Sequence, residues 1–121
     1  MIKLNLHDAE NAELAWEDFT ENGRKHVKHL PLFDATDNCV PGSRCSLLKY
    51  LPGAVTLPHV HTGYELIFVL SGVLYDDFGE YLKGDLIVYH PESKHGLRSP
   101  DGCVFLVIWE KPVTLAVEVK R

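Results

Sequence analysis

Residues 53–72 read GAVTLPHVHTGYELIFVLSG, a segment that combines strand-forming residues, turn-forming glycines and three side chains able to bind metal. His59, His61 and Glu65 all occupy odd positions, as do the apolar residues Ile67 and Val69 that follow them. Because alternate residues of a β-strand point to the same face, the two histidines face one side, and Glu65 rejoins them beyond the intervening turn. The segment therefore predicts two imidazoles and a carboxylate on one face of a sheet.

Similar short runs, bounded by turn residues, extend along the chain from residue 44. They are rich in β-branched and aromatic residues and are separated by Gly, Pro or Asp. Such spacing is typical of an all-β sandwich or barrel. The predicted strands are Arg44–Leu51, Val55–Val60, Glu65–Leu70, Val73–Asp76, Glu80–Leu82, Leu86–His90 and Cys103–Trp109.

The first forty residues give a weaker signal. Trp16 and Phe19 approximate helical spacing with the alanines before them, whereas residues 27–32 favour an extended chain. We expect peripheral strands that pack on the main sheet, because the two aromatic rings need an apolar surface. The predicted organisation is one domain in three parts: N-terminal peripheral strands and loops over 1–43, the barrel over 44–112, and a C-terminal strand or tail over 113–121.

The composition fits one small acidic domain. The chain has 121 residues, and 12 Lys and Arg stand against 17 Asp and Glu, which gives a formal net charge of −5 with His neutral. A single soluble domain commonly has about 100 to 150 residues, so a second domain does not fit. A chain with this excess of acidic residues lacks the basic surface that binds phosphate backbones, so we expect no nucleic-acid partner.

The N-terminal residues and the cysteines favour a cytoplasmic location. Residues 1–16 carry acids and no apolar block, unlike a secretory signal. The longest apolar run, Cys103–Trp109, is far shorter than the roughly 20 residues that cross a bilayer, so we expect no membrane association. Three cysteines, Cys39, Cys45 and Cys103, cannot all pair within one chain, and we expect all three to be reduced.

A fourth candidate ligand, His95, follows Glu65 by thirty residues. Three imidazoles and one carboxylate form a set of nitrogen and oxygen ligands that suits one divalent transition metal ion. The set leaves Zn²⁺, Fe²⁺, Mn²⁺ and Ni²⁺ open as the ion. A single histidine on a strand is usually a core or rim residue. Four such groups in one interior without a metal would leave several unpaired, at a cost of roughly 1 to 3 kcal/mol each.

Other polar residues leave alternatives open. His90 is the candidate catalytic acid or base near the metal, because an imidazole titrates near neutral pH, or else a rim residue. Arg98 faces either an anionic ligand at the barrel mouth or solvent. We expect Tyr64 to point away from the metal, and we expect surface positions for the remaining histidines, His7, His26 and His29.

The strand that follows Glu65 is apolar on both faces. Leu66, Phe68 and Leu70 alternate with a second apolar set. One face fits a barrel interior, and the other needs cover from a second sheet, the N-terminal segment or another subunit. We therefore expect a homodimer.

The spacing of the first histidine cluster resembles the cupin superfamily. Between Gly53 and Gly72, the glycines, the two histidines and Glu65 reproduce the first cupin motif position for position. The resemblance implies a single cupin barrel, the double-stranded β-helix or RmlC-like jelly roll, with peripheral N-terminal strands. It also implies that His59, His61 and Glu65 bind one metal ion.

The second cupin motif is matched in its frame. Gly84 and His95 stand eleven residues apart, as that motif requires, and the resemblance implies that His95 completes the metal site. Inside the frame, His90 replaces the usual proline and Glu92 the usual glycine. These departures leave the shape of the loop before His95 open.

Within the superfamily, the chain resembles the ChrR-type anti-sigma-factor cupins and their stand-alone relatives. The resemblance covers residues 44–112 and includes LLKYLPG at 47–53 and IWEKP at 108–112. It implies zinc as the metal. Those anti-sigma proteins carry an N-terminal helical domain that grips the sigma factor, and residues 1–43 are too few and too poor in helical pattern to form it. We expect no sigma-factor-binding domain in this chain.

Two functions follow. The first is a metal-binding, stand-alone ChrR-like cupin domain that binds or senses a small ligand, because four protein ligands can close a tetrahedral zinc site. The second is a small Fe(II)-dependent dioxygenase acting on a diketone or phenolic ketone, because the same ligands can leave positions on Fe²⁺ for substrate and oxygen. Metal-free epimerase and storage cupins often lose these histidines, so the intact set argues against that class. Whether the chain is an enzyme stays open.

Overall fold

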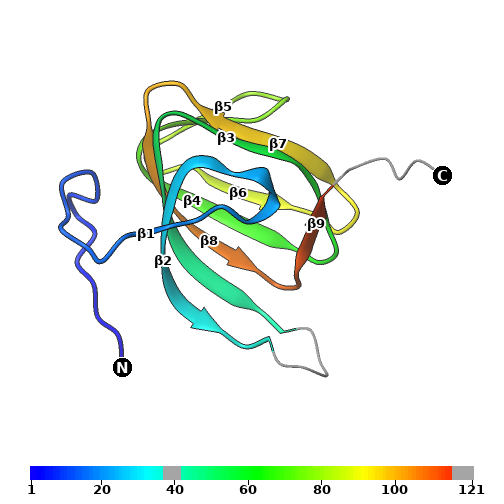
Figure 1. Cartoon of the computed structure of the whole chain (residues 1–121), viewed down its shortest axis with the longest axis horizontal. Coiled ribbons are helices and arrows are strands. Elements are labelled where there is room, and N and C mark those ends of the chain that lie inside the picture. The colour runs from blue at the N-terminus through cyan, green and yellow to red at the C-terminus, as the bar shows by residue number, and fades with distance from the viewer. Residues whose placement is uncertain (37–41, 116–121) are drawn as a thin grey trace.

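A computed structural model of the chain describes residues 1–36 and 42–115, and these form an almost entirely β structure (Figure 1). The one helical element in this part of the chain is a 3₁₀ turn, η1 (Glu21–Gly23), so the prediction of an all-β fold is confirmed. The strands are β1 (Glu17–Asp18), β2 (Lys25–Asp34), β3 (Arg44–His61), β4 (Glu65–Tyr75), β5 (Glu80–Leu82), β6 (Leu86–Tyr89), β7 (Lys94–Ser99), β8 (Cys103–Trp109) and β9 (Val113–Leu115).

All of the strand pairings are antiparallel, and β3 organises them. Its first half pairs with β2 and β8, and its second half pairs with β7 and β9. The sheet closes into a barrel because β8 also pairs with β4, which carries β5 and β6. This closed barrel with extra N-terminal strands matches the expected cupin architecture.

Two strands are longer than the sequence predicted. The runs 44–51 and 55–60 are one strand, β3, and the runs 65–70 and 73–76 are one strand, β4. The turn residues between them bend the strands without ending them. In β4, the register with β8 shifts between Val69 and Ser71, and Gly72 takes the left-handed conformation with φ of 73°.

Strand β7 was not predicted at all. Its sequence, KHGLRS, is too polar to give the usual strand signal. It nevertheless alternates, because His95, Leu97 and Ser99 are buried and the residues between them are more exposed. One inward position therefore carries an imidazole where an ordinary strand would carry an apolar side chain.

The N-terminal segment packs on the barrel, as expected. Phe19 is buried, and its ring lies 6.4 Å from the ring of Trp109 on β8. The surface position predicted for His29 is wrong, since its ring stacks on Phe19 at 4.1 Å and the residue is buried. Pairing of β1 with β2 turns His29 and Val27 toward the barrel.

The cysteines within the described residues are unpaired. Cys45 and Cys103 are free thiols, and both are buried. Cys39 lies outside the described residues. In the same part of the chain, there is no helix of the length and apolar character that a membrane span requires.

Substituting Gly72 should strongly destabilise the barrel. A Cβ at this position would lie 2.2 Å from the carbonyl oxygen of Gly102, and the backbone there has a positive φ. We expect Gly72→Ala to lower the free energy of unfolding by about 3 kcal/mol in urea titrations. Gly79→Ala is the matched control, because an added Cβ meets nothing within 4 Å. Equal losses in the two variants would contradict this assignment.

Candidate metal centre

Four side chains from three strands meet inside the barrel. His59 and His61 lie at the end of β3, Glu65 begins β4 after a short turn, and His95 pairs directly with His59 from β7. One ligating atom from each of the four lies within 4.8 Å of the others. Each residue is only 1% or 2% exposed. The structure therefore brings together all four residues that the sequence proposed as ligands.

The ring nitrogens converge on the carboxylate. His59 Nε2 and His95 Nε2 are 2.9 Å apart. Glu65 Oε2 lies 3.3 Å from His61 Nε2, and Glu65 Oε1 lies 3.4 Å from His95 Nε2. Three nitrogen atoms and two carboxylate oxygens thus surround one small volume, which is the arrangement that a bound cation requires.

Several polar atoms in this cluster lack partners. Among the described residues, His61 Nε2 and Glu65 Oε1 are buried and accept or donate no hydrogen bond. A buried polar atom left unpaired costs roughly 1 to 3 kcal/mol. A divalent cation at the centre would be held by these atoms and would remove that cost, so the residues present fit a metal ion.

Hydrogen bonds behind the rings fix which nitrogen faces the centre. His59 Nδ1 lies 3.1 Å from the carbonyl oxygen of Leu57, which can only accept, so the proton is on Nδ1. Ser93 Oγ donates to the carbonyl oxygen of His90 and therefore accepts from His61 Nδ1 at 2.8 Å. Both rings then present an Nε2 lone pair to the cluster, the form in which histidine binds metals.

The electrostatics keep His59 neutral and Glu65 ionised at neutral pH. Burial lowers the pKa of His59 to about 4, so the ring is neutral at pH 7. Burial alone would raise the pKa of Glu65, but the neighbouring His61 and His95 outweigh it and lower that pKa to about 2. Neutral imidazole and ionised carboxylate are the species that coordinate a metal.

The loop before His95, whose shape the sequence left open, is tied to β3 by backbone hydrogen bonds. Glu92 adopts a φ of 71°, the left-handed conformation that glycine favours. Its backbone N–H donates to the carbonyl oxygen of His61 at 2.7 Å, and the N–H of His61 donates to the carbonyl oxygen of Ser93 at 3.0 Å. The loop is thereby joined to the strand that carries two of the proposed ligands.

The candidate catalytic residue His90 does not join the cluster. Its side chain is exposed, and its ring lies edge-on to Tyr64 with centroids 5.6 Å apart. Tyr64 is 44% exposed, so the expectation that it points away from the cluster is confirmed. The expected surface positions of His7 and His26 are also confirmed, whereas Arg98 is exposed and lies 5.0 Å from the ring of Tyr75.

Sequence reasoning missed Tyr89, which packs against two of the proposed ligands. Its ring centroid lies 4.0 Å from that of His95 and 5.3 Å from that of His61. Its hydroxyl donates to Asp76 Oδ2 at 2.9 Å, and Tyr81 donates to the same oxygen. Tyr89 lies opposite Glu65 in the β4–β6 pairing, and no signal in the sequence indicates this register.

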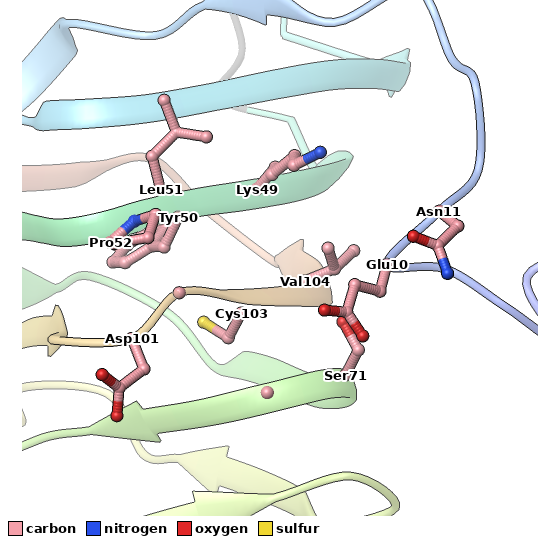
Figure 2. A pocket seen from close by; sticks show the side chains of 12 residues that line it. Glu10, Asn11, Lys49, Tyr50, Leu51, Pro52, Ser71, Asp101, Cys103 and Val104 are labelled. Carbon is pink, nitrogen blue, oxygen red and sulfur yellow. The ribbon is translucent and has the colours of Figure 1, made fainter.

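A cavity beside the first half of β3 is separate from this centre. Figure 2 shows it between that strand, the start of β8 and the N-terminal segment, with a volume of about 310 Å³. None of the four proposed ligands lies among the residues that line it. Cys103 borders it, and burial raises the pKa of that thiol to about 11, so the cavity holds no reactive thiolate at neutral pH.

Comparison with known families gives one match across most of the chain. The family model described as the ChrR Cupin-like domain matches residues 7–114. The match thus includes the N-terminal strands as well as the barrel. No curated protein matches the chain.

Solved structures share the fold at low sequence identity. The polyketide cyclase RemF from Streptomyces resistomycificus is 24% identical, with a TM-score of 0.75 over 99% of this chain and 88% of that one. An acetylacetone dioxygenase from Acinetobacter johnsonii is 13% identical, with a TM-score of 0.79 over 98% and 78%. ChrR, in complex with SigE of Rhodobacter sphaeroides, is 21% identical, with a TM-score of 0.63 over 80% of this chain and 49% of that one. At these identities the likeness establishes the fold.

Removing the hydroxyl behind His61 should weaken metal binding. In Ser93→Ala, the Nδ1 proton of His61 loses its acceptor, so the ring is no longer held in one orientation. We expect metal affinity to fall about 10- to 100-fold in competition titrations with a chelator. Ser71→Ala, which borders the separate cavity, should bind metal as the wild type does. Unchanged affinity in Ser93→Ala would show that this hydrogen bond does not orient a ligand.

Proposed function

We propose that this chain, which belongs to the ChrR cupin-like domain family, holds one divalent transition metal ion and binds or senses a small ligand beside it. The observation that carries the proposal is the group of four buried ligand atoms within 4.8 Å of one another. His59, His61, His95 and Glu65 are the proposed ligands. Zn²⁺ is the expected ion, since four protein ligands complete a tetrahedral site, and Fe²⁺, Mn²⁺ and Ni²⁺ accept the same set.

The bound ion would act as a Lewis acid toward an oxygen atom of the ligand if it took that oxygen as a fifth donor beside the four protein ligands. The protein's own residues would set the conditions for this. Leu57 and Ser93 hold the two imidazoles of β3 in one orientation, and Tyr89, anchored by Asp76, covers the cluster on its β6 side. A net charge of −5 supports a small-molecule ligand and not a nucleic acid.

The second candidate function is an iron-dependent dioxygenase acting on a diketone or a phenolic ketone. It is supported by the ligand set, which Fe²⁺ accepts, and by the shared fold of an acetylacetone dioxygenase. The test is anaerobic reconstitution with Fe²⁺, followed by oxygen-uptake measurements with both classes of compound. Turnover would make the chain an enzyme, and no uptake with any compound would favour the binding role.

Replacing one central ligand should abolish metal binding. We expect His61→Ala to retain less than about a tenth of the metal content of the wild type by elemental analysis, because three remaining ligands no longer complete the site. The wild type should gain about 2.7 kcal/mol of stability at a metal concentration of 100 times Kd, and the variant should gain none. His26→Ala, an exposed histidine on β2, is the control. Wild-type metal content in His61→Ala would contradict both candidate functions.

We also propose a homodimer in the cytoplasm. Its support is an apolar face on β4 and β6, where Phe68, Leu86 and Val88 are 38%, 59% and 45% exposed. Phe68 stands opposite Leu86, and Leu66 opposite Val88, so these side chains form one surface. The unpaired thiols of Cys45 and Cys103 suit a reducing compartment.

A charge on this face should separate the subunits. We expect the wild type to give a dimer mass in light scattering at micromolar concentration and Phe68→Glu to give a monomer mass, because a carboxylate would have to be desolvated at the interface. Phe78→Glu is the matched control, since Phe78 is 82% exposed at the β4–β5 turn, away from this face. A monomer mass for the wild type would rule out the dimer.

A further inference from the structure

The three imidazoles of the cluster are not oriented in the same way. His59 Nδ1 and His61 Nδ1 each have an oxygen acceptor, supplied by Leu57 and Ser93. His95 Nδ1 is also buried, but it has no hydrogen-bond partner within the described residues. Its other ring nitrogen, Nε2, faces the cluster and lies 2.9 Å from His59 Nε2. Packing, and not a hydrogen bond behind the ring, therefore has to hold this third imidazole in place.

Tyr89 packs closely against His95. The two ring centroids are 4.0 Å apart and the ring planes cross at 84°, an edge-on arrangement that aromatic pairs favour. The other aromatic rings beside His95 in the described part of the chain belong to His59 and His61, both at 4.5 Å, and these are proposed ligands themselves. Tyr89 is thus the aromatic ring from outside the ligand set that limits rotation of the His95 imidazole.

Tyr89 is held in turn by Asp76, at the end of β4. Asp76 is 4% exposed, and its Oδ2 accepts from the hydroxyls of Tyr89 and Tyr81 at 2.9 and 2.8 Å. Its Oδ1 accepts from the backbone N–H groups of Phe78 and Gly79 at 2.8 and 3.0 Å. A carboxylate with four donors around its two oxygens is held in one orientation, so it can hold a phenol in one orientation as well.

The charge states keep this contact intact at neutral pH. Burial alone would raise the pKa of Asp76, but hydrogen bonds from Phe78 and the two tyrosines outweigh it and lower that pKa. The Asp76 carboxyl is therefore ionised and can only accept. Burial, together with the hydrogen bond to Asp76, raises the pKa of Tyr89, so the phenol keeps the proton that it donates.

We propose that Asp76 is a positioning residue, which holds the Tyr89 ring against His95 and so keeps that imidazole turned toward the metal. Within the described residues, Asp76 forms no hydrogen bond with the four proposed ligands, so it acts on them through Tyr89. The packed ring takes the place of the oxygen acceptor that His59 and His61 have. This inference rests on the proposed function, since the orientation of His95 matters for metal affinity.

The two tyrosines that share Asp76 Oδ2 provide a matched pair of variants. Tyr89→Phe and Tyr81→Phe each remove one hydroxyl from the same oxygen, but only Tyr89 stacks with proposed ligands. We expect Zn²⁺ affinity, measured by competition with a chelator, to fall about tenfold in Tyr89→Phe and to stay at the wild-type value in Tyr81→Phe. The visible absorption spectrum of the Co²⁺-loaded protein should change only in Tyr89→Phe, a change in coordination geometry that a loss of stability alone would not produce.

A readout without metal separates this inference from the proposed function. In ¹H–¹³C NMR spectra of metal-free protein, the ring signal of His95 is identified by its loss in His95→Gln. We expect one sharp His95 signal in the wild type and in Tyr81→Phe, and a broadened or doubled signal in Tyr89→Phe. Asp76→Ala should change this signal in the same way, and Tyr89→Phe tests the proposal even where Asp76→Ala fails to fold.

The outcomes are distinct. One sharp His95 signal in Tyr89→Phe, or equal Zn²⁺ affinity in Tyr89→Phe and Tyr81→Phe, would overturn the positioning role of Asp76. A wild type that binds no metal but shows the expected NMR difference between the two variants would refute the proposed function and support the positioning of His95 by Asp76 and Tyr89.

Discussion

Desolvation of four ionisable side chains is the constraint on which the interior of this barrel depends. His59, His61, Glu65 and His95 are almost fully buried, and the side chains around them are apolar or aromatic. An isolated carboxylate or a set of unpaired imidazoles in such a place is strongly unfavourable. Their nitrogen and oxygen atoms nevertheless point at one another across about 3 Å. A divalent cation at the point of convergence, as we propose, would offset that cost.

The surroundings of the cluster serve to hold these side chains still. The loop after β6 is joined to β3 by backbone hydrogen bonds of His61. Ser93 in that loop also accepts a hydrogen bond from the imidazole ring of His61. On another side of the cluster, Asp76 accepts hydrogen bonds from two tyrosine hydroxyls. One of these tyrosines is Tyr89, whose ring packs against two of the proposed ligands. Turn chemistry, strand pairing and a buried carboxylate thus all contribute to one geometry.

The fold and the convergence of the four proposed ligands were predictable because both rest on local rules. Period-two alternation and the spacing of glycines indicated strands, and parity placed His59, His61 and Glu65 on one face. Features that depend on tertiary contacts were not predictable. The strand β7 is too polar to be detected, and the burial of His29 follows from how β1 and β2 lie against the barrel.

X-ray absorption at the edge of the metal bound to purified protein tests the central claim most directly. Coordination by three imidazoles and one carboxylate predicts nitrogen and oxygen neighbours at about 2.0 to 2.2 Å, together with the outer-shell scattering of imidazole rings. A first shell of water oxygens without imidazole scattering, or one that contains sulfur, would contradict the assignment of these four side chains as the metal ligands.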